Sequence, residues 1–380
     1  MLLYDLTSTY FECDPPERGS KKRYGYSRDR RADCVQVVLA LVITHEGFPL
    51  AYEIYPGNTQ DKSTLRDFLR RVEEQYGKAE RVWLMDRGIP TEETLEEMRR
   101  ENGLYLVGTP KGRLTKLEGK FLDQPWHAVR DHVGVKLLEE EEEFYVYVES
   151  TDRVSKERAM RRRRLKKLWK RLHELREMKQ SRDELLLRLG AAKKEAAQAW
   201  GLVGLKLPSK DQQVSAQTFS FELNKKKLRQ RRSREGRYLL RSNLPGNNPQ
   251  QAWEKYLLLT QIEQAFKDLK SDLSVRPIYH QTDSRIEAHI LICFLSYCLF
   301  VTLRALLRPH AAGLSPRSAI ELFTRMQMVD VHLPTTKGEV IVLSRYTEPD
   351  KETRLLLAML KWHLPKQPPP RVYDNGKVVV

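Results

Sequence analysis

Residues 35–43, with the sequence VQVVLALVI, form the segment that most restricts how this chain can fold. The run is apolar except for Gln36, and many of its residues are β-branched. A strand with one wet face alternates polar and apolar residues, whereas a strand covered on both faces reads as a continuous apolar run. We therefore predict a central strand here, in a sheet that is packed on both faces.

The segments around this strand alternate between strand and helix patterns. Residues 2–12 alternate side by side, which places Asp5, Thr7 and Thr9 on one face of a strand. Three strands followed by helix–strand–helix–strand predict an α/β fold, with a mixed sheet and flanking helices. The order resembles that of the ribonuclease-H-like fold. The remaining predicted elements are strands at 50–55, 81–85 and 104–108 and helices at 61–76 and 91–100.

The pattern changes after residue 110. Residues 113–150 favour a small β region, in which the acidic run Glu139–Glu143 is interpreted as a solvated turn. Residues 155–199 are strongly helical, with Leu165, Leu168, Leu172 and Leu175 at heptad spacing and Leu186 and Leu189 back in phase.

A returning strand is predicted at 238–244, and long helices at 250–271 and 284–307. The last part has a helix begun by Ser315–Pro316, a strand near 340–343, a helix after Pro349, and a loose proline-rich tail. The predicted regions are a first part of the core at 1–110, a basic insertion at 111–236, a second part of the core at 237–308, and a C-terminal α/β extension at 309–380.

The positive charge of the chain is concentrated in two segments. The formal net charge is +16 and the pI is near 9.6. Residues 156–171 hold ten Lys or Arg against one acid, and residues 225–237 hold eight against one, so these segments account for the whole net charge. Local basic surfaces of this kind favour an anionic partner, because neutralised phosphates release counterions. A solvated surface helix laced with charges is the alternative.

Cysteine and histidine spacing indicates no metal site of the zinc type. The four cysteines form no C-x-x-C pair, and the histidines are scattered, so a reducing cytoplasmic location is expected. No signal peptide opens the chain. The apolar run 288–302 is shorter than the roughly 20 residues that cross a bilayer, and we interpret it as a buried helix without a membrane partner.

One predicted helix places charged side chains beside a buried face. On a helix over 256–273, six apolar residues share a stripe of roughly 100°. Tyr256, Glu263 and Lys270 fall together on the neighbouring flank. A solvated helix edge produces the same arrangement, so geometry alone leaves both interpretations open. The apolar residues of the stripe are Leu258, Ile262, Ala265, Phe266, Leu269 and Leu273.

The spacing of Tyr256, Glu263 and Lys270 resembles the Tyr-x2-Arg-x3-Glu-x6-Lys signature of the insertion-sequence four superfamily of bacterial DDE transposases. The surrounding residues IEQAFKDLKSDLSVRPIYHQTDSRIEAHI resemble its sixteen-thirty-four branch. The motifs LYDLTSTYFE, YPGNTQDKSTL and VWLMDRGIP resemble that branch too, in the same order. The resemblance covers about 1–110 and 237–308, and the basic region between them corresponds to the insertion that this superfamily carries.

The resemblance implies a catalytic and metal-binding triad of Asp5, Asp86 and Glu263. Two Mg²⁺ ions, for which Mn²⁺ could substitute, would activate the attacking oxygen and stabilise the leaving oxygen. Carboxylates are the ligands that Mg²⁺ prefers. By the same resemblance Asp5 would bridge both ions. Taken separately, Asp5 is equally explained as a strand-end or exposed residue, and Asp86 as a turn former.

The implied partner is double-stranded DNA, both transposon ends and target, bound by a homodimer in the bacterial nucleoid. Lys270 would contact a phosphate, and Tyr256 would orient Glu263 or touch the DNA backbone. A turn at the helix exit is an equally good interpretation of Arg276. The further expected DNA contacts are Lys267, Arg276, Arg161, Arg162, Arg163 and Arg164.

Two departures from the family pattern bear on function. Leu259 stands where the signature has Arg, so a phosphate contact expected there is absent or supplied elsewhere. Only four residues precede Asp5, whereas relatives carry an N-terminal DNA-binding region first, so we expect a piece that transposes poorly alone. The main hypothesis is a transposase that cuts DNA and joins 3′-hydroxyls. The alternatives are a non-catalytic DNA-binding remnant and a ribonuclease-H-like nuclease.

Overall fold

The computed structural model describes residues 1–13, 19–29, 31–77, 79–140, 142–210, 212–374 and 377–378. The chain packs as two compact units. The first combines Met1–Ala79 with Leu258–Val380, and the second is Glu80–Leu257. These packing units have limits that differ from those of the four predicted regions.

The first unit is built on three antiparallel strands in the order β3-β2-β1. They are β1 (Leu2–Phe11), β2 (Val35–Thr44) and β3 (Pro49–Pro56), as the sequence predicts. Nine of the ten residues of β2 are buried, which agrees with its continuous apolar run. In the register of the sheet, Asp5 of β1 lies opposite Leu41 of β2.

Helices of the first unit pack on this sheet. The 3-10 turn η1 (Asp61–Ser63) leads into α1 (Leu65–Tyr76), and the ring of Tyr4 on β1 contacts Phe68 of α1. The Tyr4 hydroxyl donates to Thr64 Oγ1 at 2.8 Å. Helix α8 (Leu259–Ser271) packs against β1 and β2. Both helices use the apolar stripes that their sequences predict.

Helix α9 (Asp283–Leu307) is buried on one face only, so the prediction of a buried helix at 288–302 is half right. The Tyr297 hydroxyl donates to the carbonyl of Gly47, and Phe294 contacts the Tyr52 ring of β3. At 25 residues the helix is longer than its apolar run. Among the described residues it is the one helix long and apolar enough to cross a membrane, and 33% of its most apolar window is buried. The buried core helices of many soluble proteins satisfy the same length and composition. Its exposed apolar residues are Leu291, Ile292, Leu295, Leu299 and Leu306.

The C-terminal part of the first unit is more ordered than the sequence predicts. Ser315 caps α10 (Pro316–Phe323), and Asp350 caps α11 (Lys351–Leu360). The expected strand near 340 is present, but β12 was missed. Residues 363–370 of the tail have no regular secondary structure, whereas the tail forms a strand over Arg371–Asp374. Backbone pairing with β13 recruits the tail despite its prolines. The antiparallel order is β12 (Met328–Pro334), β13 (Val340–Tyr346), β14 (Arg371–Asp374) and β15 (Lys377–Val378).

The second unit contains a mixed sheet in the order β4-β5-β11-β8-β7-β6. Strands β4 (Val82–Met85) and β5 (Leu104–Gly108) are parallel, as the intervening helix α2 (Glu92–Arg100) requires, with Thr91 as its cap. The predicted small β region does not stand apart, because its strands continue this sheet through β11. The other elements are α3 (Lys111–Leu117), η2 (Glu118–Phe121), β6 (His127–Arg130), β7 (Val133–Glu140), β8 (Glu143–Ser150), β11 (Arg237–Ser242) and α7 (Pro249–Leu257).

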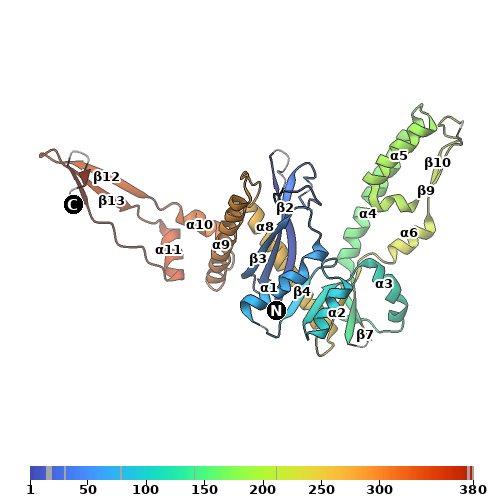
Figure 1. The fold of residues 1–380 in the computed structure, drawn as a ribbon, viewed down its shortest axis with the longest axis horizontal. Coiled ribbons are helices and arrows are strands. Elements are labelled where there is room, and N and C mark those ends of the chain that lie inside the picture. The colour runs from blue at the N-terminus through green and yellow to red at the C-terminus, as the bar shows by residue number, and fades with distance from the viewer. Residues whose placement is uncertain are drawn as a thin grey trace. The chain divides into compact units, whose positions relative to one another are not determined.

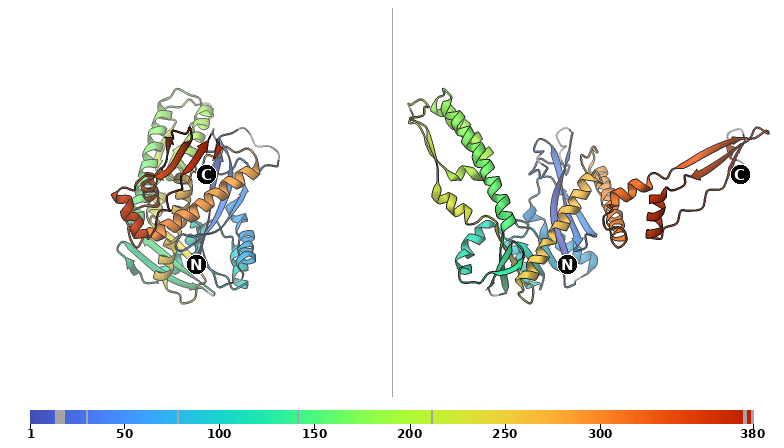
Figure 2. Two further views of the ribbon diagram at one scale, coloured as in Figure 1. Left: turned by 90° about the vertical axis from the view of Figure 1, so that its left-hand side faces the viewer. Right: turned by 180° about the vertical axis from the view of Figure 1, so that it is seen from behind.

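A helical hairpin projects within the second unit from the end of β8 (Figures 1 and 2). Leu168, Leu172 and Leu175 of α4 (Thr151–Glu177) pack against Leu185 and Leu189 of α5 (Arg182–Ala196). Leu186 is 37% exposed, so its predicted place in the buried stripe is wrong. Leu185 takes the buried position instead, while Leu189 is buried as predicted. The hairpin continues into η3 (Ala197–Leu202), β9 (Val203–Lys206), β10 (Ser220–Leu223) and α6 (Lys225–Arg232).

The predicted fold class is confirmed: the chain is an α/β protein with a mixed sheet and flanking helices. The predicted element order of the first 110 residues is also confirmed, from β1 through α1, β4 and α2 to β5.

Candidate active site

Asp5 lies in the middle of β1 and is half-buried. Its Oδ1 accepts a hydrogen bond from the backbone N–H of Leu6 at 2.8 Å. Residues two apart share a face of a strand, so Asp5 points to the same side as Thr9. The Thr9 hydroxyl donates to the carbonyl of Val275 at 3.0 Å, just beyond α8. Asp5 therefore faces the side of the sheet on which the segment after α8 lies.

Glu263 lies on α8 at the edge of its buried stripe. Ile262, Ala265, Phe266 and Leu269 are buried, as predicted, while Glu263 is exposed. Within the described part of the chain, the Glu263 carboxylate is free of ion pairs. Asp5 and Glu263 thus come from two elements that pack against each other in the first unit.

The predicted continuous helix over 256–273 is interrupted, which changes the argument about Tyr256. Helix α7 ends at Leu257 and α8 begins at Leu259. At this junction the backbone N–H of Gln261 donates to the carbonyl of Leu258, three residues earlier. This spacing makes a tighter turn than that of an α-helix. Glu263 and Lys270 still share α8, but Tyr256 belongs to α7 and to the second unit.

Asp86 follows β4 directly and is exposed. Its Oδ1 accepts a hydrogen bond from the Tyr256 hydroxyl at 3.0 Å. Burial, reinforced by the Asp86 carboxylate, raises the pKa of Tyr256 well above its usual value, so the phenol stays a proton donor. Tyr256 was expected to orient Glu263 or touch DNA. In the structure its hydroxyl donates to Asp86 instead, and its ring contacts Tyr238.

Gly108 makes room for this pair and was not singled out in the sequence. A Cβ atom at Gly108 would lie 2.6 Å from the Tyr256 hydroxyl oxygen and 3.2 Å from the Arg87 backbone nitrogen. No larger residue is accommodated there without moving the tyrosine. A glycine at the end of a buried strand is the signal that could have indicated such a close approach.

The three predicted carboxylates divide between the units, with Asp5 and Glu263 in the first and Asp86 in the second. Among the residues that the structure describes, no group of three or more His, Cys, Asp or Glu side chains is arranged to hold a metal ion. The chemistry of the donors suits a hard cation, because all three are carboxylates and two are exposed. The triad therefore stays a prediction.

Lys270 is held by an acid that the sequence interpretation overlooked. Its Nζ donates to Asp29 Oδ1 at 2.8 Å, and Arg276 pairs with the same carboxylate. Burial lowers the pKa of Lys270, while Asp29 opposes that change. Lys267, one turn earlier, is exposed. Lys270 and Arg276, which are both expected to contact DNA, are thus already paired with Asp29 within the protein.

Leu259 is 8% exposed and packs in the core at the start of α8. An arginine at this place would bury a charged guanidinium, which is costly unless the group is paired with an acid. The departure from the family signature therefore coincides with an apolar position, and the leucine side chain has no group that could donate to a phosphate.

The basic run of α4 is not uniform. Arg161 is 9% exposed, and its Nε donates to Oε1 of the buried Glu235 at 2.5 Å. The structure thus pairs Arg161 with an acid from the second basic segment, and its predicted contact with DNA stays a prediction. Arg162, Arg163 and Arg164 are exposed. These three side chains are therefore accessible, as a contact with DNA requires.

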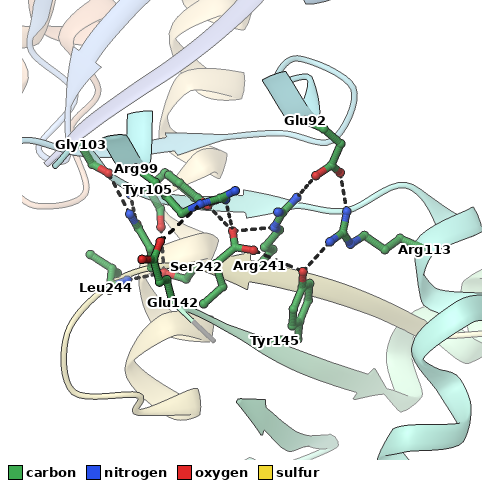
Figure 3. Close-up of polar contacts among 12 residues, drawn as sticks. Glu92, Arg99, Gly103, Tyr105, Arg113, Glu142, Tyr145, Arg241, Ser242 and Leu244 are labelled. Atoms are coloured by element: carbon green, nitrogen blue, oxygen red, sulfur yellow. Dashed lines mark hydrogen bonds and ion pairs between the residues drawn. The ribbon is translucent and has the colours of Figure 1, made fainter. Parts of the chain in front are cut away.

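A buried ion cluster around Arg241 was also missed (Figure 3). Arg241 on β11 donates to Glu143 at 2.6 Å and to Glu92 at 2.7 Å. Arg99 donates to the same Glu143 oxygen at 2.9 Å, and the Tyr105 hydroxyl also bonds it. The interpretation of Glu139–Glu143 as a solvated turn is wrong for Glu143, whose side chain is 10% exposed. The signal was an arginine directly after the apolar residues Tyr238, Leu239 and Leu240 of a strand.

Comparison with known proteins identifies the family. The model of a transposase DDE domain matches residues 8–299. This range includes Asp86 and Glu263 and begins three residues after Asp5. A solved structure with similarity is the cryo-EM structure of a piggyBac transposase synaptic complex with hairpin DNA, at 6% identity and a TM-score of 0.44. The match covers 94% of this chain and 51% of that one, so the chain spans about half the length of that protein. A search of curated proteins gives no match. Because the transposase DDE domain model spans most of its length, the chain belongs to that family.

Proposed function

We propose that this chain is the catalytic part of a bacterial insertion-sequence transposase that cuts DNA and joins the 3′-hydroxyl ends to target DNA. The observation that carries the proposal is the hydrogen bond from Tyr256 to Asp86. It joins two motifs that lie far apart in the sequence, the tyrosine of the family signature and the aspartate after β4. In a member of a transposase family, a carboxylate held this way suits a catalytic site better than a turn former.

In the proposed site each carboxylate has a distinct setting. Tyr256 donates to one oxygen of Asp86 and so restricts how that carboxylate turns. The Leu6 amide does the same for Asp5. Glu263 lies exposed on a helix whose buried stripe fixes its position. Asp5, Asp86 and Glu263 would hold Mg²⁺, which supplies activation of the attacking oxygen and charge neutralisation at the leaving oxygen.

The surface cations support DNA as the partner. Arg162, Arg163 and Arg164 are exposed on α4, and Lys267 is exposed on α8. Segment 225–232, which forms most of the second basic stretch, folds as the short helix α6. Exposed cations favour phosphates through counterion release and carry no sequence preference by themselves.

The test is a nicking and strand-transfer assay on labelled duplex DNA with Mg²⁺. Asp86→Asn, Asp5→Asn and Glu263→Gln should each lower nicking by at least about a hundredfold, the order of loss seen when one charge-stabilising group is removed. Asp67→Asn, on the exposed face of α1, is the matched control and should be fully active. Wild-type protein that binds DNA without nicking would identify a non-catalytic remnant. Nicking without joining would identify a nuclease.

A further inference from the structure

The carboxylate of Asp29 lies between two cations of the first unit. Lys270 Nζ donates to its Oδ1 at 2.8 Å, and Arg276 pairs with the same oxygen. Lys270 belongs to the last turn of α8, Arg276 follows that helix, and Asp29 comes from the segment between β1 and β2. One acid thus pairs with two of the side chains that are expected to contact DNA.

The arrangement is buried, yet it is incomplete. The side chains of Asp29 and Lys270 are 8% and 11% exposed. Oδ2 of Asp29 is buried, and among the described residues it has no hydrogen-bond partner. Leaving a buried charged oxygen unsatisfied costs free energy, and such groups in native proteins call for an explanation. A purely structural ion pair would satisfy both oxygens.

Cations outnumber acids around this carboxylate. Arg28 precedes Asp29 and pairs with Asp61. Burial lowers the pKa of Lys270, and repulsion from Arg276 and Arg28 adds to that effect. A phosphodiester carries its negative charge on two oxygens, so it could accept from Lys270 and Arg276 at separate atoms. Arg276 is 32% exposed, which gives an incoming anion access to the pair.

We propose that Asp29 stands in for a DNA phosphate on Lys270 and Arg276 and is displaced when a backbone phosphate binds. The inference rests on the proposed function, since it takes DNA as the partner. In the DNA-free protein Asp29 keeps the two cations oriented and offsets one of their two positive charges. In the complex the phosphate takes both hydrogen bonds, and the Asp29 carboxylate turns away. Asp29 is then a positioning residue that also lowers affinity for DNA in general.

The test replaces Asp29 by asparagine in the full chain, which removes the charge and keeps the shape. Binding to a labelled random-sequence duplex should tighten about tenfold, the factor that one charge-assisted hydrogen bond of about 1.4 kcal/mol represents. The dependence of affinity on salt should stay unchanged, because Lys270 and Arg276 contact the phosphate in both complexes and the number of neutralised phosphates is the same. Glu53→Gln is the matched control, because Glu53 pairs with Arg71 in the same unit and its loss changes the net charge equally.

Equal tightening by Asp29→Asn and Glu53→Gln would overturn the inference, because the gain would then come from net charge alone. Lys270→Gln, added to Asp29→Asn, should remove about one phosphate contact from the salt slope. If Asp29→Asn is unfolded at the assay temperature, the salt slope of Lys270→Gln, made in the wild-type background, is the deciding measurement. A slope reduced by about one contact supports the inference, and an unchanged slope overturns it. Wild-type protein that does not bind DNA would overturn the proposed function as well.

Discussion

The ion clusters around Arg241 and around Asp29 are both buried, but they differ in how completely their groups are satisfied. Arg241 bonds two carboxylates, and Glu143 accepts from Arg99, Tyr105 and Arg241. In the other cluster two cations share one oxygen of Asp29, while Oδ2 has no hydrogen bond among the described residues. A cluster in which the charged groups have their hydrogen bonds suits a structural role. A cluster that leaves a carboxylate oxygen without a hydrogen bond can exchange its acid for another anion.

The Arg241 cluster is expected to affect the stability of the protein, and the Asp29 cluster its binding to DNA. Removing a member of the Arg241 cluster leaves a buried charge without a partner, which is costly. Removing Asp29 leaves Lys270 and Arg276, of which Arg276 already reaches water. The two clusters should therefore respond to mutation in different assays.

The largest expected effect is that of Glu143→Ala. Arg241, whose side chain is 4% exposed, loses a main acceptor, so the free energy of unfolding of the second unit should fall by about 3–5 kcal/mol. Urea denaturation followed by tryptophan fluorescence measures this, because five of the six tryptophans lie in that unit. Glu142→Ala, at the exposed neighbour, should change stability by less than about 0.5 kcal/mol. Similar losses in both variants would contradict the structural role of the cluster.

Arg161→Ala should be nearly as damaging, at about 3 kcal/mol, because it leaves the buried Glu235 without its bidentate partner. The DNA affinity of this variant, measured under conditions in which it is folded, should fall no more than the loss of one positive charge requires. Arg163→Ala, two residues along the same helix, is the control and should leave stability unchanged. A stable Arg161→Ala protein with weakened DNA binding would restore the original interpretation of the run.

Gly108→Ala should cost about 1–3 kcal/mol, since the added methyl group overlaps the Tyr256 hydroxyl. Nicking should fall too, because Asp86 loses its donor. Tyr256→Phe removes the hydroxyl at a cost of about 1 kcal/mol. Combined with Gly108→Ala it should be less harmful than the sum of the two, as expected for neighbours. Strict additivity in the double-mutant cycle would show that the two residues do not meet.

The smallest effect is expected for Arg163→Ala in DNA binding. If Arg163 contacts a phosphate, the salt slope should fall by about 0.9 with no loss of stability. An unchanged slope would mean that this face of α4 is only solvated. The measurement is a titration of labelled duplex at several salt concentrations.

The sequence predicts most elements of the fold because their signals are local. The apolar run of β2 and the Thr91 cap of α2 lie within the segments that they define. Buried charge has no such local signal. Arg161 and its partner Glu235 are far apart in the chain, as are Lys270 and Asp29, and each residue alone resembles a surface residue. The same limit applies to the proposed site, where motifs indicate Asp5, Asp86 and Glu263 but not Gly108 or Asp29.

The division of the chain also bears on how the protein is made. Strands β1–β3 are synthesised first, yet α8 and α9, which pack with them, follow only after the whole second unit. At ribosomal rates of about 5–20 residues per second, the early strands wait roughly 10–40 seconds for their partners. The second unit, continuous in sequence, can fold during that wait. We expect nascent chains to resist protease first over Glu80–Leu257, and the exposed apolar sheet of β1–β3 to need a chaperone until α8 emerges. Early protection of Met1–Ala79 in arrested chains would show that the order is reversed.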